Sequence, residues 1–332
     1  ARSSGKPGVV LVTSGPGATN TVTPIRDCMA DSIPIVVISG QVPTTAIGTD
    51  AFQEAPVSAI MGAVSKHIFL VTDPLLLEST IRSAFELAKT GRPGPVVVDI
   101  PKDIQNWEGE FLGSGSLPLT GYRNRLETVM NNNLNDELGK NFYKLLSKSK
   151  KPLIYAGGGV INADASSKLR QFSETYKIPI VTTLMALGAS DTTKSLSLHM
   201  LGMHGLASAN YAVEDCDFLI AIGARFDDRV AGDPKGFAPN AKKIAHFDID
   251  ISEINKVKSV DWYHVGSLKK DLNDLIALGE KIEFVSDFSG WHSHIEKLKE
   301  EYKLNYNKNS ELIQPYEVIE EINKLSRGEA II

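Results

Sequence analysis

Short apolar runs rich in β-branched residues recur along this chain, and they limit its fold more than any other feature. Examples are Val9–Val12, Ile35–Ile38, Val96–Ile100 and Asp217–Ile222. Runs of this length, without regular polar alternation, are typical of strands buried on both faces of a parallel sheet. Segments with helical spacing lie between them, as in Pro74–Lys89. The alternation predicts an α/β fold with consecutive parallel sheets.

Composition excludes several classes of protein. The chain has 332 residues, enough for about two domains of ordinary size. Its net charge of −5 gives no general attraction to nucleic acid or to an anionic membrane, and no apolar run approaches the roughly 18 residues of a transmembrane helix. Cys28 and Cys216 form no zinc pattern, and the histidines are scattered. We therefore expect no nucleic-acid partner, no membrane and no metal ligands within the chain.

The order of these segments predicts a division into blocks. Residues 1–105 form a first α/β block, and residues 106–135 form a linker rich in glycine, serine and asparagine. Residues 136–305 form a second α/β block, whose apolar runs are followed by glycines and charged residues. Residues 313–332 resemble the first helix of a third domain.

Two arginines and two aspartates follow the predicted strand 217–222, in Gly223–Arg229. In open α/β sheets, ligands bind beyond the carboxyl ends of the strands. Arginine forks suit phosphate groups, and aspartates suit hydroxyls or other arginines. The alternative is an ion-pair network that pins a loop. Gly157–Gly159 and Asp248 also end predicted strands, where they could meet a phosphate and a ribose hydroxyl. Together they predict a nucleotide-cofactor site in the second block.

The first block offers weaker signals. Thr13–Asn20 follows a strand and contains a G-x-G pattern, but Asn20 stands where the third glycine of the dinucleotide fingerprint would be, so a tight turn is an equal alternative. Gln53 is a candidate ligand contact, and Phe52 could be a core anchor or a ligand wall. Arg92 and Lys102 flank the third apolar run, where they could bind an anion or be solvated at the surface.

Six ordered motifs identify a resemblance that covers nearly the whole chain. The chain is similar to the acetohydroxyacid (acetolactate) synthase catalytic subunits in Thr13–Asn20, Gly40–Pro43, Ile47–Glu54, Gly91–Pro95, Met200–Gly205 and Gly223–Arg229. The resemblance implies a partial domain that binds the pyrimidine of thiamine diphosphate (ThDP), then a central, Rossmann-like domain that binds FAD. It implies decarboxylation of pyruvate and condensation with pyruvate or 2-ketobutyrate, toward valine, leucine and isoleucine.

The resemblance also implies roles for individual residues. Gln53 and Lys102 are its catalytic candidates in this chain. The residues implied to face the thiamine pyrimidine are Pro16, Asn20 and Gln53. Those implied to line FAD are Arg92, Gly157, Gly158, Gly159, Thr183, Leu184, Met203, His204, Gly223, Arg225, Asp227, Arg229, Asp248 and Ile249. Those implied to line the substrate channel are Pro43, Ala51, Phe52, Lys102, Met203, Asp228 and Arg229. From the sequence alone, His204 is more often a packing residue than a general base.

The family pattern sets expectations for what surrounds the chain. The proton-relay glutamate would precede Ala1, and the Gly-Asp-Gly…Asn motif that binds Mg²⁺ and the diphosphate would follow Ile332. We therefore expect a fragment that is inactive alone. The resemblance further implies a homodimer or larger assembly, a regulatory small subunit, and a location in the cytoplasm of a bacterium or an organelle of a eukaryote. The competing interpretations are a glyoxylate carboligase-like enzyme and a non-catalytic FAD-binding relative.

Overall fold

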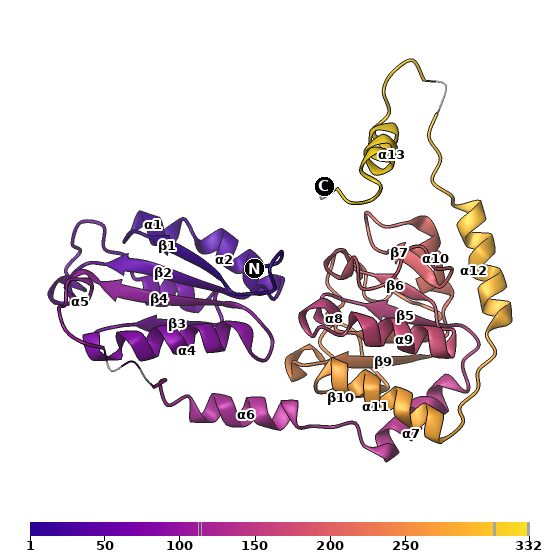
Figure 1. Cartoon of the computed structure of the whole chain (residues 1–332), viewed down its shortest axis with the longest axis horizontal. Coiled ribbons are helices and arrows are strands. Elements are labelled where there is room, and N and C mark those ends of the chain that lie inside the picture. The colour runs from indigo at the N-terminus through magenta and orange to yellow at the C-terminus, as the bar shows by residue number, and fades with distance from the viewer. Residues whose placement is uncertain (112, 114, 308–309, 331–332) are drawn as a thin grey trace.

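The computed structural model describes residues 1–111, 113, 115–307 and 310–330. Two bodies, each built on a parallel sheet, stand side by side in Figure 1 and are joined along one edge by a helix. Leu112 and Ser114 of the predicted linker, and Ile331 and Ile332 of the predicted third segment, lie outside the described residues. Within the described part of the chain, no helix is long and apolar enough to cross a membrane.

The first body is a four-stranded sheet in the order β1-β2-β4-β3. Its strands are β1 (Gly8–Val12), β2 (Ile35–Gln41), β3 (His67–Leu70) and β4 (Pro95–Pro101). Its helices are α1 (Pro16–Thr19), α2 (Val22–Ala30), α3 (Val57–Gly62), α4 (Leu77–Lys89) and α5 (Lys102–Gln105), with short 3₁₀ turns η1 (Thr44–Ala46) and η2 (Pro74–Leu76). Helix α4 packs on one face, over Val36, Val96 and Val98, while the opposite face, with Val37 and Val97, packs on Ala18, Ile25, Val57 and Met61.

The second body is a six-stranded parallel sheet in the order β10-β9-β8-β5-β6-β7. Its strands are β5 (Pro152–Ala156), β6 (Ile180–Thr182), β7 (Ser197–Met200), β8 (Phe218–Ile222), β9 (Lys243–Asp248) and β10 (Trp262–Val265). Its helices are α7 (Asp136–Leu146), α8 (Gly159–Asn162), α9 (Ser166–Tyr176), α10 (Ala207–Asp215), α11 (Leu268–Lys281) and α12 (Ser289–Glu301), with 3₁₀ turns η3 (Leu184–Ala186) and η4 (Ile251–Glu253). Its strands β5 and β8 are buried throughout, inside one large core cluster.

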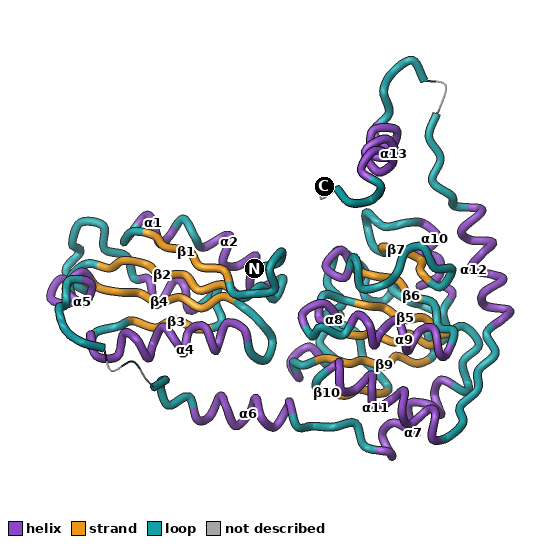
Figure 2. The backbone as a smooth tube through the Cα atoms, in the orientation of Figure 1, coloured by secondary structure: helices purple, strands orange, loops and turns teal. Residues whose placement is uncertain are grey.

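Two further helices lie outside these bodies. Figure 2 shows α6 (Thr120–Met130) and α13 (Pro315–Ser326) with loop on both sides. The expectation of loop structure throughout the linker is therefore wrong at α6. That helix contacts the first domain in two ways. Tyr122 packs against the core cluster of Val36, Val96 and Val98, and the Arg123 guanidinium donates to both carboxylate oxygens of Glu86 at 2.8 Å. All but one of the residues in α13 are exposed, and none of them is buried.

The parallel α/β fold is confirmed, but one predicted strand is less buried than expected. The β1 strand pairs only with β2, and Val9 and Leu11 are 57% and 77% exposed. The apolar run Val9–Val12 predicts burial on both faces. In fact β1 is an edge strand, and α4 packs on β2, β3 and β4 instead.

Candidate functional site

The central sheet changes direction between β5 and β8. From β5 the chain builds outward through β6 and β7, and from β8 through β9 and β10. Ligands of open α/β sheets bind in the crevice at such a switch point, beyond the carboxyl ends of the strands. A cavity of about 550 Å³ lies there, lined by Gly157 after β5 and Gly223 after β8. This volume is typical of small-molecule and cofactor sites.

The cavity gathers most of the residues predicted to line a flavin. All of them lie on its wall except Met203 and His204, which stand on an exposed loop. The cavity also has a wall from the first domain, formed by Asp31 and Ser32 before β2 and by Lys89–Pro93 before β4. The amino ends of the first sheet therefore face the carboxyl ends of the second. Most residues predicted to line FAD thus share one cavity, and flavin binding there stays a prediction.

The glycines at the switch point are required mainly for packing. A Cβ on Gly157 would lie 2.2 Å from the Gly223 carbonyl oxygen, and one on Gly159 would lie 2.8 Å from the Gly223 Cα. The sequence predicted that glycines here would let a phosphate reach backbone N–H groups at a helix start. Two of their own amides are already used, because the Gly157 N–H donates to Ile222 O at 2.9 Å and the Gly159 N–H to Gly223 O at 3.0 Å. These glycines let two strand ends and α8 approach closely, and the cavity forms beside them.

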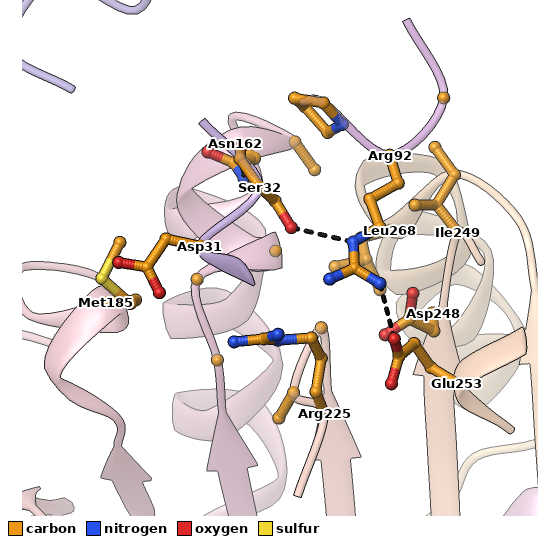
Figure 3. A pocket seen from close by; sticks show the side chains of 18 of the residues that line it. Asp31, Ser32, Arg92, Asn162, Met185, Arg225, Asp248, Ile249, Glu253 and Leu268 are labelled. Carbon is orange, nitrogen blue, oxygen red and sulfur yellow. Dashed lines mark hydrogen bonds and ion pairs between the residues drawn. The ribbon is translucent and has the colours of Figure 1, made fainter. Parts of the chain in front are cut away.

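Charged and polar groups on the rim fit a large polar ligand. Arg225 lies 3.6 Å from Asp227, a loose ion pair that leaves guanidinium donors for another partner. The buried hydroxyl of Thr183, on the cavity wall, has no hydrogen-bond partner among the described residues. Buried polar groups are nearly always hydrogen-bonded, so this one indicates a ligand or a water. Figure 3 shows Arg92 and Arg225 in the cavity, with Asp248 and Glu253 beside Arg92.

Arg92 joins the two domains across the cavity. Its Nη1 lies 2.5 Å from Glu253 and 3.3 Å from Asp250, on the turn that follows β9, and its Nε donates to Ser32 at 3.0 Å. The Glu253 side chain is only 2% exposed and also contacts Lys256. Although burial opposes it, hydrogen bonds from Ser252 and Arg92 lower the pKa of Asp250. The sequence predicted Arg92 as a ligand contact and missed its role as an interdomain ion pair.

Lys66 supports the loop that carries Arg92, and sequence reasoning did not find it. Its Nζ donates to the carbonyls of Leu87 (2.6 Å), Thr90 (2.6 Å) and Arg92 (2.9 Å). Two of these carbonyls are at the end of α4, where a cation stabilises unpaired carbonyls. Burial lowers the pKa of Lys66 to about 8. No local pattern marks this residue, because its partners are more than 20 positions away.

The carboxyl ends of the first sheet form a second group. A Cβ on Gly15 would lie 2.5 Å from the Gln53 carbonyl oxygen, and one on Gly40 would lie 3.3 Å from the Ser14 nitrogen. The G-x-G loop, the end of β2 and the Gln53 loop therefore meet. Pro16 begins α1 and Asn20 ends it, both exposed near this meeting point. The sequence-predicted pyrimidine contacts are thus close in space.

The residues predicted for the substrate channel fall into two groups. Pro43 and Lys102 lie near each other, because the residues that follow them are hydrogen-bonded: the Thr44 amide donates to the Asp103 carboxylate at 3.0 Å. Ala51 donates its amide to Glu54 at 3.1 Å, and the adjacent Phe52 is 90% exposed. The remaining members, Met203, Asp228 and Arg229, belong to the central domain, where the Met203 amide donates to Arg229 O at 3.1 Å. Within the described residues, no hydrogen bond or ion pair joins the two groups.

Other cavity residues were not predicted. They are Asp31, Ser32, Lys89, Thr90, Leu126, Met130, Asn162, Ala163, Met185, Val230, Glu253, Gly266 and Leu268. Several of these come from turns before the first-domain strands and from the linker helix α6, so they become neighbours only after the domains dock. Ser32 stands out in the structure, because its φ of 57° is uncommon for a residue other than glycine. The sequence alone does not show this angle. No group of three or more histidines, cysteines or acids in the described residues could hold a metal ion.

Comparison with known proteins relates these two sites to one family. Residues 1–60 match the model of the thiamine pyrophosphate enzyme N-terminal TPP binding domain, and residues 140–275 match that of the thiamine pyrophosphate enzyme central domain. The first match covers β1 and β2 of the first sheet, and the second covers all six strands of the second sheet. The chain belongs to the thiamine pyrophosphate enzyme family. The central-domain match includes β5 to β10, and therefore the wall of the cavity at the switch point.

Relatives within this family are similar along the whole chain. The large subunit of acetolactate synthase from Corynebacterium glutamicum is 46% identical over 334 residues, which cover all of this chain and 52% of that protein. Acetolactate synthase 2, chloroplastic, from Nicotiana tabacum is 44% identical and covered to 49%. The chloroplastic acetolactate synthase of Arabidopsis thaliana is 43% identical and also covered to 49%. The chain thus spans about half the length of the curated relatives it matches.

Proposed function

We propose that the protein is the catalytic subunit of an acetolactate synthase. It would decarboxylate pyruvate and join the remaining two carbons to a second pyruvate or to 2-ketobutyrate, in the biosynthesis of branched-chain amino acids. One observation carries the proposal: five of the six motifs shared with these enzymes gather at two places in space. The Thr13–Asn20, Gly40–Pro43 and Ile47–Glu54 motifs meet at the carboxyl ends of the first sheet, and Gly91–Pro95 and Gly223–Arg229 line the interdomain cavity. The sixth, Met200–Gly205, lies off the cavity wall but contacts Arg229 through the Met203 amide.

The first domain would hold the pyrimidine ring of thiamine diphosphate with Pro16, Asn20 and Gln53. When bound, this cofactor supplies the electron sink that decarboxylation needs. The closely packed loops would orient the ring and exclude water from one side of it. Lys102, exposed at the start of α5, would attract the carboxylate of the substrate. Magnesium would pair with the diphosphate through ligands outside this chain.

The interdomain cavity would hold FAD through the residues predicted above that line it. The unpartnered Thr183 hydroxyl, the donors of Arg225 and the carboxylate of Asp248 provide groups for a flavin dinucleotide. The cavity lies at the amino ends of the first sheet, and the thiamine loops lie at the carboxyl ends. As the family resemblance implies, FAD would have a structural role.

A second copy of the chain would complete the substrate channel. Pro43, Ala51, Phe52 and Lys102 follow strands of the first sheet, whereas Met203, Asp228 and Arg229 follow strands of the second. Because only the amino ends of the first sheet face the central domain, one copy does not present both groups to the same space. We therefore propose a homodimer or larger assembly, joined by a regulatory small subunit. Plant relatives are named chloroplastic, which supports an organelle if the source is eukaryotic. For a bacterial source we propose the cytoplasm.

The test is a product assay on the full protein that the gene encodes, supplied with ThDP, Mg²⁺ and FAD. Acetolactate from pyruvate, and acetohydroxybutyrate when 2-ketobutyrate is added, would support the proposal. Faster turnover of glyoxylate than of pyruvate would favour the carboligase alternative. FAD binding without any carboligation product would favour a non-catalytic flavin-binding relative.

A further inference from the structure

A buried polar cluster lies beneath the predicted thiamine loops, and the reaction assigns it no role. Asp99, on β4, is 1% exposed, and so is Ser39, its register partner on β2. The Ser39 hydroxyl donates to one Asp99 oxygen at 2.6 Å, and the Gln41 amide donates to the other at 3.0 Å. Both carboxylate oxygens are therefore hydrogen-bonded, although no lysine, arginine or histidine among the described residues forms an ion pair with them.

Gln41 extends this cluster to the loop above it. The Nε2 of Gln41 also donates to the Ala55 carbonyl at 3.1 Å, while its Oε1 accepts the Val42 amide at 2.9 Å. Ser39 and Gln41 are two positions apart on a strand, so both face the side of the sheet that holds Val37 and α3. One buried amide side chain thus ties β2, β4 and the start of the α3 segment together.

The loop that Gln41 contacts carries a strained backbone. Gln53 has a φ of 62° and Asp50 a φ of 55°, a conformation that side chains other than glycine rarely adopt. Such residues persist only where the surroundings over-determine them, and they often mark functional sites. Glu54 closes the loop by accepting the amides of Gly48 and Ala51. The Glu54 contacts stabilise the loop internally, whereas the Gln41 contact attaches it to the sheet.

We infer that Gln41, oriented by Asp99, is the positioning residue that fixes the Ala51–Ala55 loop on the sheet and thereby sets Gln53 at the thiamine site. The inference rests on the proposed function for its cofactor and deepens it by naming what holds the predicted contact. Gln41 touches no cofactor in this account. It acts through the Ala55 carbonyl, two residues from Gln53, and through the close approach of Gln53 to Gly15.

The test compares amide exchange with cofactor affinity in the full protein. In Gln41→Leu, hydrogen exchange at the Glu54 and Val57 amides should accelerate about tenfold, because the Ala55 carbonyl loses its tie to the sheet. The dissociation constant for thiamine diphosphate, measured with Mg²⁺ by calorimetry, should rise about fivefold to tenfold. If this variant does not fold, Gln41→Asn serves instead, since its shorter side chain cannot span both partners.

Two matched variants separate positioning from general loss of stability. Asp99→Asn retains an acceptor for Gln41 and a donor for Ser39, so exchange and affinity should stay within about twofold of wild type. Ser83 lies on α4, which packs on the other face of the sheet. Its buried hydroxyl donates to Ser79 O and accepts the Leu117 amide. Ser83→Ala removes this hydroxyl and should leave the Ala51–Ala55 loop unchanged.

Either of two results would overturn the inference: unchanged loop exchange in the Gln41 variants, or faster exchange with unchanged affinity for thiamine diphosphate. A wild-type protein that binds no thiamine diphosphate would overturn the proposed function instead. The exchange data would then still decide whether Gln41 holds the loop.

Discussion

The two domains share a parallel α/β plan but differ in what lies at the carboxyl ends of their strands. In the central domain those ends open on a cavity with charged walls, and the opposite wall comes from the other domain. In the first domain they support loops that pack on one another and on a buried hydrogen-bonded cluster. The comparison indicates two kinds of site. One surrounds a large ligand with charges, and the other positions a few backbone and side-chain groups.

The difference extends to the charges that hold each site. The central site depends on Arg92, whose partners Asp250 and Glu253 belong to the other domain. The first-domain site depends on Asp99, whose partners Ser39 and Gln41 are uncharged and belong to the same sheet. Breaking the central site should therefore affect domain docking, whereas breaking the first should affect only the loop above the sheet.

The largest expected effect is at Gly157. In Gly157→Ala, the new methyl would overlap the backbone of Gly223 and Ala224, so the ends of β5 and β8 must separate. We expect a loss of about 3 kcal/mol in the free energy of unfolding of the central domain, measured by urea denaturation. Gly290→Ala in α12 is the control, because nothing lies within 4 Å of its added Cβ, and it should change stability by at most about 0.5 kcal/mol. A loss under about 1 kcal/mol at Gly157 would contradict the packing role.

The next effect concerns the interdomain ion pair. Arg92→Met leaves the buried Glu253 carboxylate with Lys256 as its remaining partner. We expect a loss of about 2 kcal/mol in stability, seen in urea denaturation, and faster proteolysis in the linker as the domains separate. The double variant Arg92→Met/Glu253→Gln should recover most of this loss.

Arg82→Met is the matched control for that pair. Arg82 also pairs with a glutamate, but on the exposed surface of α4, where the bond contributes at most about 0.5 kcal/mol. Equal effects of the two arginine variants would show that the interdomain pair does not hold the domains.

A smaller effect depends on pH. Burial raises the pKa of the Asp99 carboxyl above its ordinary value, although hydrogen bonds from Ser39 and Gln41 oppose the rise. The folded state therefore holds the proton at a pH where the unfolded chain has lost it, and stability falls as the pH rises through that window. Asp99→Asn removes this dependence. Its stability relative to wild type, measured by urea denaturation, should increase as the pH rises from acid toward neutral, and a flat difference would contradict the direction of the shift.

The smallest effect is at Thr183. In Thr183→Val, an unpartnered buried hydroxyl is replaced by a methyl of similar size. Without cofactor, the melting temperature should stay the same or rise slightly, since no protein hydrogen bond is lost. The affinity for FAD should nevertheless fall about fivefold if the flavin is the missing partner. An unchanged affinity would assign that hydroxyl to a water.

The sequence predicted the interior of both sheets well and their edges poorly. Strands β1, β2, β4, β5, β6, β8 and β9 were predicted, because each carries a run of apolar residues. Strands β3, β7 and β10 were missed. They are four-residue strands, each with at least one exposed or half-exposed position, and such short segments leave no apolar run.

The candidate site was predictable where its residues follow strands directly. Gly223–Arg229 and Asp248 needed only the rule that ligands meet the carboxyl ends of strands. Contacts made when domains dock were not predictable, as with Arg92 and Glu253, which are 161 positions apart. Spacing also could not show that the Gly157 amide donates to the neighbouring strand β8.

The most direct measurement is a titration of FAD into the full protein that the gene encodes, followed by flavin fluorescence and repeated with Arg92→Met and Thr183→Val. The account predicts saturable binding of one FAD per chain, weakened in both variants and unchanged in the Arg82→Met control. Absence of flavin binding, or equal affinity in wild type and both cavity variants, would show that the interdomain cavity is not the flavin site.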